Sequence, residues 1–148
     1  KGIPIIGICN GFQIITECNL LPGALMKNSD PKFICKDINL KINRENLFSK
    51  LYDKKNTIKL PIAHSQGNYY IKKSQIKSLI DNQQIFFQYS DRKGVVDENS
   101  NPNGSLLNIA GLTNTGGNVI GMMPHPERAI KNKLTDGKEF FKGLNNLL

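Results

Sequence analysis

A single cysteine lies between two glycines where an apolar run changes into a helical pattern, in the stretch Gly7-Ile8-Cys9-Asn10-Gly11. Small neighbours permit a tight strand-to-helix turn, which exposes the side chain at its apex to a substrate. The N-terminus of the following helix favours a thiolate and can bind an oxyanion. The pattern suits a nucleophilic cysteine. It is equally typical of a structural cysteine buried at a strand end, so this stretch alone leaves both interpretations open.

Two histidines in the chain could serve such a thiol as a base. His125 stands between prolines in Pro124-His125-Pro126-Glu127, where the fixed proline backbone limits the freedom of the loop. In an extended segment Glu127 leaves the backbone on the same side as His125 and can orient its imidazole. We therefore assign Cys9, His125 and Glu127 as candidate nucleophile, base and orienting residue. The alternative is a loop histidine paired with a surface glutamate.

His64 is the competing histidine, in the stretch His64-Ser65-Gln66-Gly67. It also follows a strand-like segment, but no carboxylate is close to it in the sequence. We interpret this loop as one wall of a substrate site, with His64, Ser65 and Gln66 as candidate contacts. A loop histidine satisfied by the backbone explains the pattern almost as well.

The elements that must position these residues are those of an α/β protein. Residues 3–8 are apolar and mostly β-branched, as in a strand buried on both faces of a parallel sheet, and residues 11–19 have helical spacing. A second apolar strand at 119–123 leads into the segment that carries His125. Sites in α/β sheets lie at the carboxyl ends of parallel strands. We therefore predict that Cys9 and His125 meet at one edge of a mainly parallel central sheet with helices on both faces.

Several further elements follow from local patterns. We predict strands at 33–42, 57–63, 85–89 and 106–112, with a short helical turn at 47–52. The loop 114–118 is typical of a hairpin between the last two strands. Ser74 is expected to cap a short helix, and Asp136 with Glu139 forms a capping-box-like start to the last one.

We expect residues 1–148 to form a single domain, because this length suffices for one core. A strand inside a parallel sheet normally follows an earlier strand and helix that cover it, yet only two residues precede this one. We therefore expect the N-terminal strands of the domain to be missing from this chain.

Charge and cysteine content argue against several functions. The net charge of +8 arises from 17 lysines against 3 arginines, and no aromatic–basic alternation marks an RNA-binding surface, so we expect no nucleic-acid partner. No apolar run approaches the ~20 residues of a membrane span. Three cysteines without C-x-x-C spacing indicate a reducing, cytoplasmic setting and no metal site.

Together these motifs resemble those of the class I, or triad, glutamine amidotransferases, and among them the glutaminase subunits of the synthases that make phosphoribosylformylglycinamidine. The resemblance covers essentially the whole chain and is jointly specific, which a lone Cys-x-Gly-x-Gln would not be. It rests on six stretches: Cys9-Asn10-Gly11-Phe12-Gln13, Leu20-Leu21-Pro22-Gly23-Ala24-Leu25, Pro61-Ile62-Ala63-His64, Asn101-Pro102-Asn103-Gly104-Ser105, Ile109-Ala110-Gly111 and Met122-Met123-Pro124-His125-Pro126-Glu127-Arg128.

The resemblance implies a flavodoxin-like fold and the hydrolysis of glutamine to glutamate and ammonia. Cys9 would attack the side-chain amide, with His125 as base and then acid and Glu127 orienting it. The Asn10 N–H would be an oxyanion donor, and Gln13 with the 64–67 loop would shape the glutamine pocket. At Ser65-Gln66 the chain departs from the Gly-Glu usual in the family.

The resemblance also implies a partner. Ammonia would pass to a separate synthetase subunit that converts formylglycinamide ribonucleotide to formylglycinamidine ribonucleotide in de novo purine synthesis, and a small accessory subunit is compatible with this arrangement. ATP and magnesium would bind that synthetase, because this chain has no phosphate-binding loop, and no cofactor is expected here. Two other functions stay open: another cysteine hydrolase on the same fold, and a non-catalytic module that only binds the synthetase.

Overall fold

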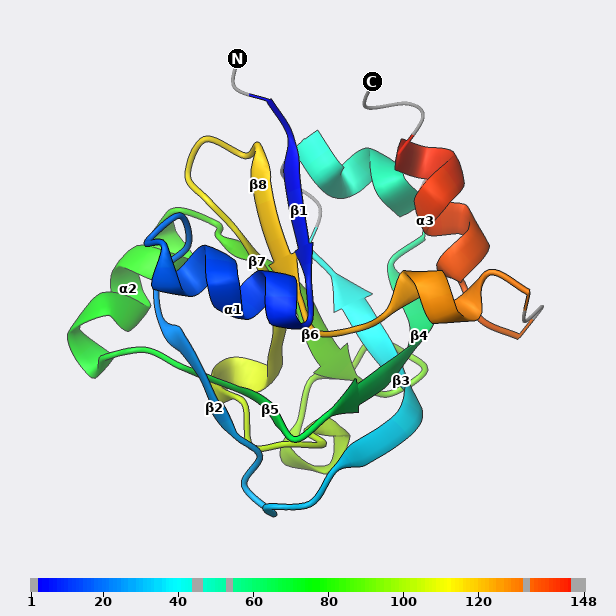
Figure 1. Ribbon diagram of the computed structural model, residues 1–148, viewed down its shortest axis with the longest axis horizontal. Helices are drawn as coiled ribbons and strands as arrows, with labels where there is room; N and C mark the ends of the chain where they lie inside the picture. Colours follow the sequence, from blue (N-terminus) through cyan, green and yellow to red (C-terminus); the bar gives the residue numbers. More distant parts are fainter. Residues whose placement is uncertain (1–2, 44–46, 53–54, 132–133, 145–148) are drawn as a thin grey trace.

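The computed structural model describes residues 3–43, 47–52, 55–131 and 134–144. A six-stranded sheet in the order β1-β8-β7-β6-β3-β4 forms its centre (Figure 1). The strands of this sheet are β1 (Ile5–Ile8), β8 (Val119–Met122), β7 (Ile109–Thr113), β6 (Ile85–Ser90), β3 (Ile34–Ile42) and β4 (Thr57–His64). A smaller antiparallel sheet pairs β2 (Ala24–Lys27) with β5 (Gln66–Tyr70).

Short helices connect and cover the strands. The α-helices of the described residues are α1 (Asn10–Glu17), α2 (Lys73–Asp81) and α3 (Gly137–Leu144). The 3-10 segments are η1 (Leu47–Tyr52), η2 (Glu98–Ser100), η3 (Leu106–Asn108) and η4 (Pro126–Ala129). Among these helices none combines the length and the apolar character that a membrane crossing requires.

The central sheet is mixed, which corrects the prediction of a mainly parallel sheet. Over the described residues β1 and β8 run parallel, whereas β8/β7, β7/β6, β6/β3 and β3/β4 are antiparallel. The loop 114–118 shows the reason: a parallel neighbour needs a crossover of a dozen or more residues, whereas a short hairpin returns the chain antiparallel. The parallel pair of the described residues, β1 with β8, consists of the strands that lead into Cys9 and His125.

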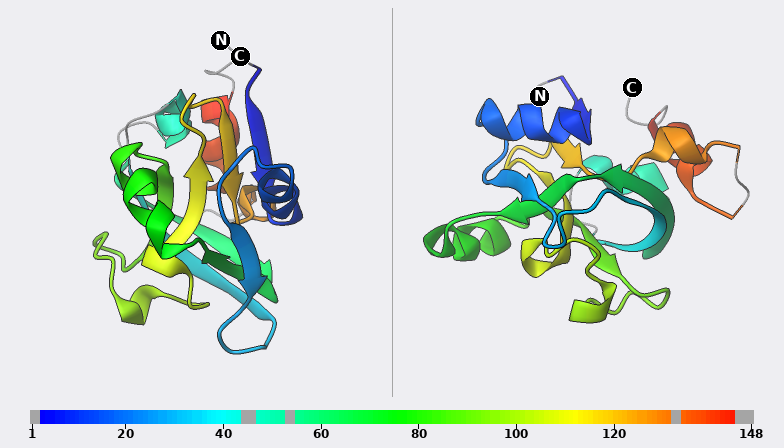
Figure 2. Two further views of the ribbon diagram at one scale, coloured as in Figure 1. Left: turned by 90° about the vertical axis from the view of Figure 1, so that its left-hand side faces the viewer. Right: turned by 60° about the horizontal axis from the view of Figure 1, so that its bottom comes forward.

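Helices cover both faces of the sheet, as predicted for an α/β domain. Successive residues of β8 point to opposite faces, so Val119 packs in one apolar cluster with Phe12 of α1, and Ile120 packs in the other with Phe140 of α3. α1 lies against β1 and β8, and α3 packs against η1 and η4 (Figure 2). The sheet between the two clusters is thereby buried on both sides near the site.

Local differences from the predicted elements have simple causes. The strand expected at 106–112 begins at Ile109, because Leu107 and Asn108 adopt positive φ angles in η3. α2 begins one residue before Ser74 and has Lys72 as its N-cap, so the predicted cap at Ser74 is wrong.

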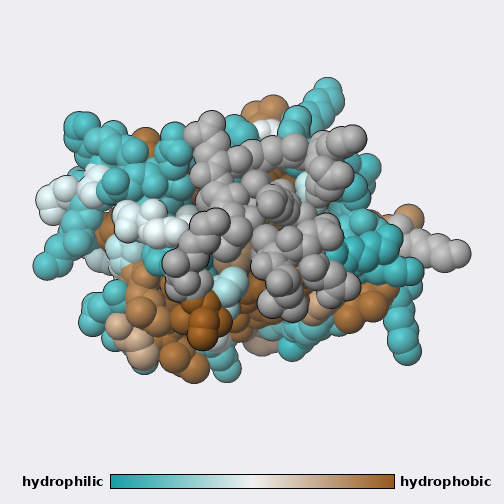
Figure 3. Space-filling model, turned by 90° about the horizontal axis from the view of Figure 1, so that it is seen from above, coloured by the Kyte–Doolittle hydropathy of each residue, from teal (hydrophilic) through white to brown (hydrophobic). Residues whose placement is uncertain are grey.

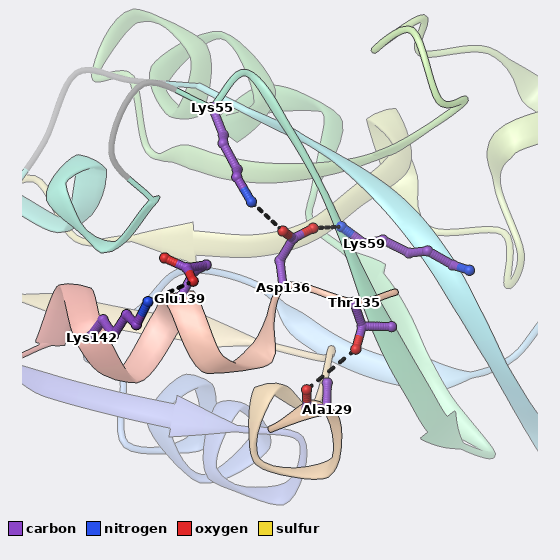
Figure 4. Close-up of polar contacts among 7 residues, drawn as sticks. All are labelled: Lys55, Lys59, Ala129, Thr135, Asp136, Glu139 and Lys142. Carbon is purple, nitrogen blue, oxygen red and sulfur yellow. Dashed lines mark hydrogen bonds and ion pairs between the residues drawn. The ribbon is translucent and has the colours of Figure 1, made fainter. Parts of the chain in front are cut away.

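A polar clamp ties the start of α3 to β4 (Figure 4). The Asp136 carboxylate, predicted to cap a helix, accepts hydrogen bonds from the Lys59 backbone N–H at 2.7 Å and from Lys55 Nζ at 2.5 Å. The Asp136 N–H donates to the Lys59 carbonyl at 2.9 Å, and the Thr135 hydroxyl donates to the Ala129 carbonyl at 3.3 Å. The segment that follows His125 is therefore anchored to the strand that ends at His64.

The face of the molecule seen from above carries both hydrophilic and apolar residues (Figure 3). Seen from above, a patch of apolar residues interrupts the hydrophilic surface (Figure 3). Ile3, Ile5 and Ile14, in and around β1 and α1, are among the exposed large apolar side chains. In the described chain β1 is an edge strand with β8 as its neighbour.

Candidate active site

The parallel pairing of β1 with β8 brings two distant loops together. Ile8 and Met122 are register partners at the ends of the two strands, and the Cys9 N–H donates to the Met122 carbonyl at 2.8 Å. The turn that begins at Cys9 therefore lies beside the end of β8, from which the chain continues toward His125. This is the carboxyl edge of the parallel pair, where the sequence predicts the site.

Cys9 forms a strained elbow between β1 and α1. Its φ of 54° and ψ of −106° are unfavourable for an L-residue other than glycine, and such strain collects at functional sites. The turn is tight because Gly7 lies directly against the Gly11 backbone and Ile15, so a Cβ at position 7 would clash. Cys9 is the N-cap residue of α1 and is partly exposed, so the thiol stands at the positive end of a helix.

The surroundings of the thiol act on its pKa in opposite directions. Partial burial raises the pKa of Cys9, and the negative charge of Glu127 adds to this effect. A hydrogen bond from the Asn10 N–H and the positive charge of Arg128 lower it, but burial dominates. At neutral pH the thiol therefore keeps its proton, and nucleophilic attack requires a base.

His125 is held in one orientation by its neighbours. Its Nδ1 lies 2.5 Å from Glu127 Oε1, and its backbone N–H donates to the Pro61 carbonyl of β4 at 2.8 Å. Because the carboxylate accepts at Nδ1, the neutral imidazole carries its proton there and has a lone pair at Nε2. The side chain is 8% exposed, and among the described residues its buried Nε2 has no hydrogen-bond partner.

The structure brings the three candidate catalytic residues to one edge of the sheet. Glu127 is bonded to His125, and its charge acts on the Cys9 thiol. No hydrogen bond joins Cys9 to His125: within the described residues His125 Nε2 has no partner, and the Cys9 thiol lies 4.0 Å from Asn10 Oδ1. Such contacts are often long without substrate and shorten when it binds.

The candidate substrate residues line the same region. Gln13 Nε2 of α1 donates to Gln66 Oε1 of β5 at 3.2 Å, so these two side chains bridge the helix to the predicted substrate wall. Gln66 is exposed, as are Asn10 and Ser65. His64 differs from them, because it is only 3% exposed and part of the interior.

Sequence reasoning missed two residues of the site. Asn28 is 4% exposed. Its side-chain amide forms hydrogen bonds with the backbone carbonyl of His64 and with the imidazole ring of His64. Its sequence signal is weak, since asparagine is abundant in this lysine- and asparagine-rich chain. Arg128 lies 3.8 Å from Glu127 and acts on the Cys9 thiol, and its position next to Glu127 was the available clue. Among the described residues, no group of three His, Cys, Asp or Glu side chains is placed to hold a metal ion.

Comparison with known proteins gives consistent matches. Residues 2–138 match the family described as CobB/CobQ-like glutamine amidotransferase domain. The chain is 53% identical to phosphoribosylformylglycinamidine synthase subunit PurQ of Pyrococcus horikoshii, covering 97% of this chain and 63% of that relative. It is 51% identical to the same subunit of Pyrococcus furiosus, with the same coverage of 97% and 63%.

A solved structure agrees with these sequence matches. PurLQS from Thermotoga maritima aligns with a TM-score of 0.77 at 39% identity, covering 98% of this chain and 62% of that one. The chain thus spans about 63% of the length of the curated relatives named here.

Proposed function

The chain belongs to the family of CobB/CobQ-like glutamine amidotransferase domains, and we propose that it hydrolyses glutamine to glutamate and ammonia with Cys9, His125 and Glu127 as its catalytic residues. One observation carries this proposal. The bonded pair of His125 and Glu127 lies at the same sheet edge as a strained, partly exposed cysteine whose thiol is protonated and needs a base.

Acylation follows from the positions of these groups. The Cys9 thiol proton passes to His125 Nε2 while sulfur forms a bond to the amide carbon of glutamine. The carbonyl electron pair moves onto oxygen, where the Asn10 N–H and the start of α1 stabilise it. Glu127 keeps the ring oriented and stabilises the imidazolium. The C–N bond then breaks as His125 returns the proton to the leaving nitrogen, which departs as ammonia.

Deacylation uses the same groups in reverse. A water molecule gives a proton to His125 Nε2 and adds to the thioester carbon. The C–S bond breaks, sulfur takes the proton back from His125, and glutamate leaves. One water and one glutamine are consumed, and one glutamate and one ammonia are formed. Gln13, Ser65 and Gln66 would bind the substrate during both steps, and His64 would contact it during acylation.

The proposal extends to a partner. The curated relatives are named as subunits of phosphoribosylformylglycinamidine synthase, and the solved relative is PurLQS. We propose that this chain likewise supplies ammonia to a synthetase subunit that aminates formylglycinamide ribonucleotide in purine synthesis, with a small accessory subunit as a further member. ATP and magnesium would act on the synthetase, with no cofactor on this chain. A reducing cytoplasm suits its unpaired thiols.

Labelling by a reactive glutamine analogue that alkylates thiols tests the proposal. Cys18 and Cys35 are exposed, whereas Cys9 is only partly exposed. Cys18 and Cys35 therefore serve as internal controls for labelling that follows exposure alone. A general alkylator should modify Cys18 and Cys35 first. The glutamine analogue should modify Cys9 selectively, and added glutamine should protect it.

Labelling that follows exposure instead, with no protection by glutamine, would overturn the proposal. Absence of any Cys9 labelling would favour a non-catalytic module that only binds the synthetase. Cys9 labelling by many acyl compounds with no preference for glutamine would favour another cysteine hydrolase.

A further inference from the structure

Asn28 holds His64 through bonds that leave its amide no alternative orientation. Asn28 Nδ2 lies 3.0 Å from the Lys32 carbonyl and 3.0 Å from the His64 carbonyl, so both of its hydrogens are donated to acceptors. The other amide atom, Oδ1, lies 3.1 Å from His64 Nδ1. Reversing the amide would place an oxygen against two carbonyl oxygens, which is unfavourable.

This arrangement fixes the tautomer of His64. Asn28 Oδ1 can only accept, so His64 Nδ1 must carry the proton, and Nε2 of the neutral ring has a lone pair. Gly67 lies so close to the ring that a Cβ there would clash with it, which restricts turning of the imidazole. Burial and the neighbouring His125 lower the pKa of His64 to about 4, so the ring is neutral near pH 7.

The Nε2 atoms of both histidines are buried acceptors that lack a hydrogen-bond partner among the described residues. His64 is 3% exposed and His125 is 6% exposed, and neither Nε2 has a hydrogen-bond partner in the part of the chain that the structure describes. The two residues belong to adjoining segments, since the His125 N–H donates to Pro61, three positions before His64 on β4. A buried unpaired acceptor is unfavourable, so each Nε2 suits a ligand that donates a hydrogen bond, as an amide NH₂ group or ammonia can.

We propose that Asn28 holds His64 as a fixed neutral acceptor for the nitrogen that leaves glutamine, first as the amide NH₂ and then as ammonia. This role rests on the proposed glutaminase function. The proton that completes ammonia comes from Cys9 through His125, while His64 accepts a hydrogen bond from a hydrogen already on that nitrogen. His64 forms no covalent bond and exchanges no proton. It would favour C–N cleavage by binding the departing group, with Asn28 as its positioning residue.

Nitrogen NMR of the protein labelled in its histidines tests the tautomer directly, because the chain has two imidazoles to assign. The His64 ring should carry its proton on Nδ1 and stay neutral from pH 7 to near pH 4. Asn28→Ala should give a mixture of tautomers. A His64 ring protonated on Nε2, or one that titrates near pH 6.5 in the folded protein, would overturn the inference.

The leaving group separates this role from others. Glutamate γ-methyl ester has the same α-amino and α-carboxyl groups as glutamine, but its leaving oxygen has no hydrogen to donate. His64→Asn should lower kcat for glutamine about tenfold relative to kcat for the ester, the effect of one hydrogen bond. His64→Gln, whose amide reaches the position of Nε2, should retain most of the glutamine turnover. Both variants are assayed in the natural protein assembled with its synthetase.

The outcomes distinguish failure of the proposed His64 role from failure of the proposed glutaminase function. Equal losses for amide and ester, or an increase confined to KM for both, would assign His64 to α-amino binding or to folding and overturn the inference. Cys9 labelling by the glutamine analogue should persist in His64→Asn, showing an intact nucleophile. If the unsubstituted protein neither releases ammonia nor is labelled at Cys9, the proposed function itself is wrong, and the inference falls with it.

Discussion

Cys9 combines two properties that a purely structural cysteine would not need. Its backbone is strained at a φ of 54°, and its thiol sits under a helix N-terminus while partial burial keeps it protonated. Strain of this kind costs on the order of 1–3 kcal/mol and persists where the surroundings enforce it. At Cys9 the surroundings are the close approach of Gly7 to the backbone of the following helix and the hydrogen bond from the Cys9 N–H to the Met122 carbonyl. Under the proposed mechanism the Cys9 thiol reacts when His125 removes its proton, which would protect it from indiscriminate alkylation.

The pH dependence of the free energy of unfolding tests whether His64 is buried as a neutral ring. The pKa of His64 is about 4 in the folded protein against an ordinary 6.5, because burial disfavours the imidazolium. The unfolded chain therefore binds more protons between these values, and stability falls as pH decreases from about 6.5 to 4. The loss should be on the order of 3 kcal/mol. Urea unfolding at pH 7 and pH 4.5 measures it.

The matched control is His64→Gln, which cannot titrate in this range. Its stability should change less between the two pH values than that of the unsubstituted protein. Identical pH dependence of the two proteins would show that His64 is not buried as a neutral ring.

At the scale of elements, close packing of α1 on β8 depends on one glycine. A Cβ at Gly121 would strike the ring of Phe12, which is fully buried and stacked on Tyr69 at 6.3 Å between ring centroids. Gly121→Ala should therefore reduce the free energy of unfolding by about 1–3 kcal/mol, the usual cost of overpacking. Denaturant titration gives the value.

Gly11→Ala is the matched substitution on the helix side. Apart from its chain neighbours and the nearby backbone of its own helix, no atom of the described residues lies within 4 Å of a Cβ at Gly11, and alanine has the better helix propensity by up to ~1 kcal/mol. This variant should be as stable as the unsubstituted protein or more so. Equal destabilisation by both alanines would contradict the packing described here.

The clamp at Asp136 gives a second prediction for elements (Figure 4). Asp136→Asn removes the charge that binds the Lys59 N–H and Lys55, and hydrogen bonds to charged groups contribute ~1.5–3 kcal/mol. We expect a loss of about 1–2 kcal/mol by thermal or urea unfolding, because Lys55 is partly exposed. Glu139→Gln disrupts the exposed pair with Lys142 and should change stability by less than ~0.5 kcal/mol. Similar effects of the two variants would exclude a structural role for the clamp.

At the scale of the molecule, the sequence predicted best what depends on local chemistry. The strand that ends at Cys9, the loop with His125 and Glu127, the hairpin at 114–118 and the helical turn at 47–52 all occur where their residue types predicted them. Glycine, proline and alternating apolar residues act within a few positions, so their effects can be read along the chain.

Features set by long-range pairing were not predictable in the same way. An apolar strand has the same composition in a parallel and an antiparallel sheet when both faces are buried, so the mixed sheet was mistaken for a mainly parallel one. Asn28 meets His64 from 36 positions away, and Asp136 meets Lys59 from 77 positions away. No local pattern marks either contact.

Ammonia release from glutamine by the natural protein, assembled with its synthetase, tests the central claim most directly. We expect release by the unsubstituted protein and by Cys18→Ala, and a loss of roughly 10³-fold or more in Cys9→Ala. Cys18 is a suitable control because it is exposed and lies on the helix side of the same elbow. Undiminished ammonia release by Cys9→Ala would contradict the assignment of Cys9 as the nucleophile.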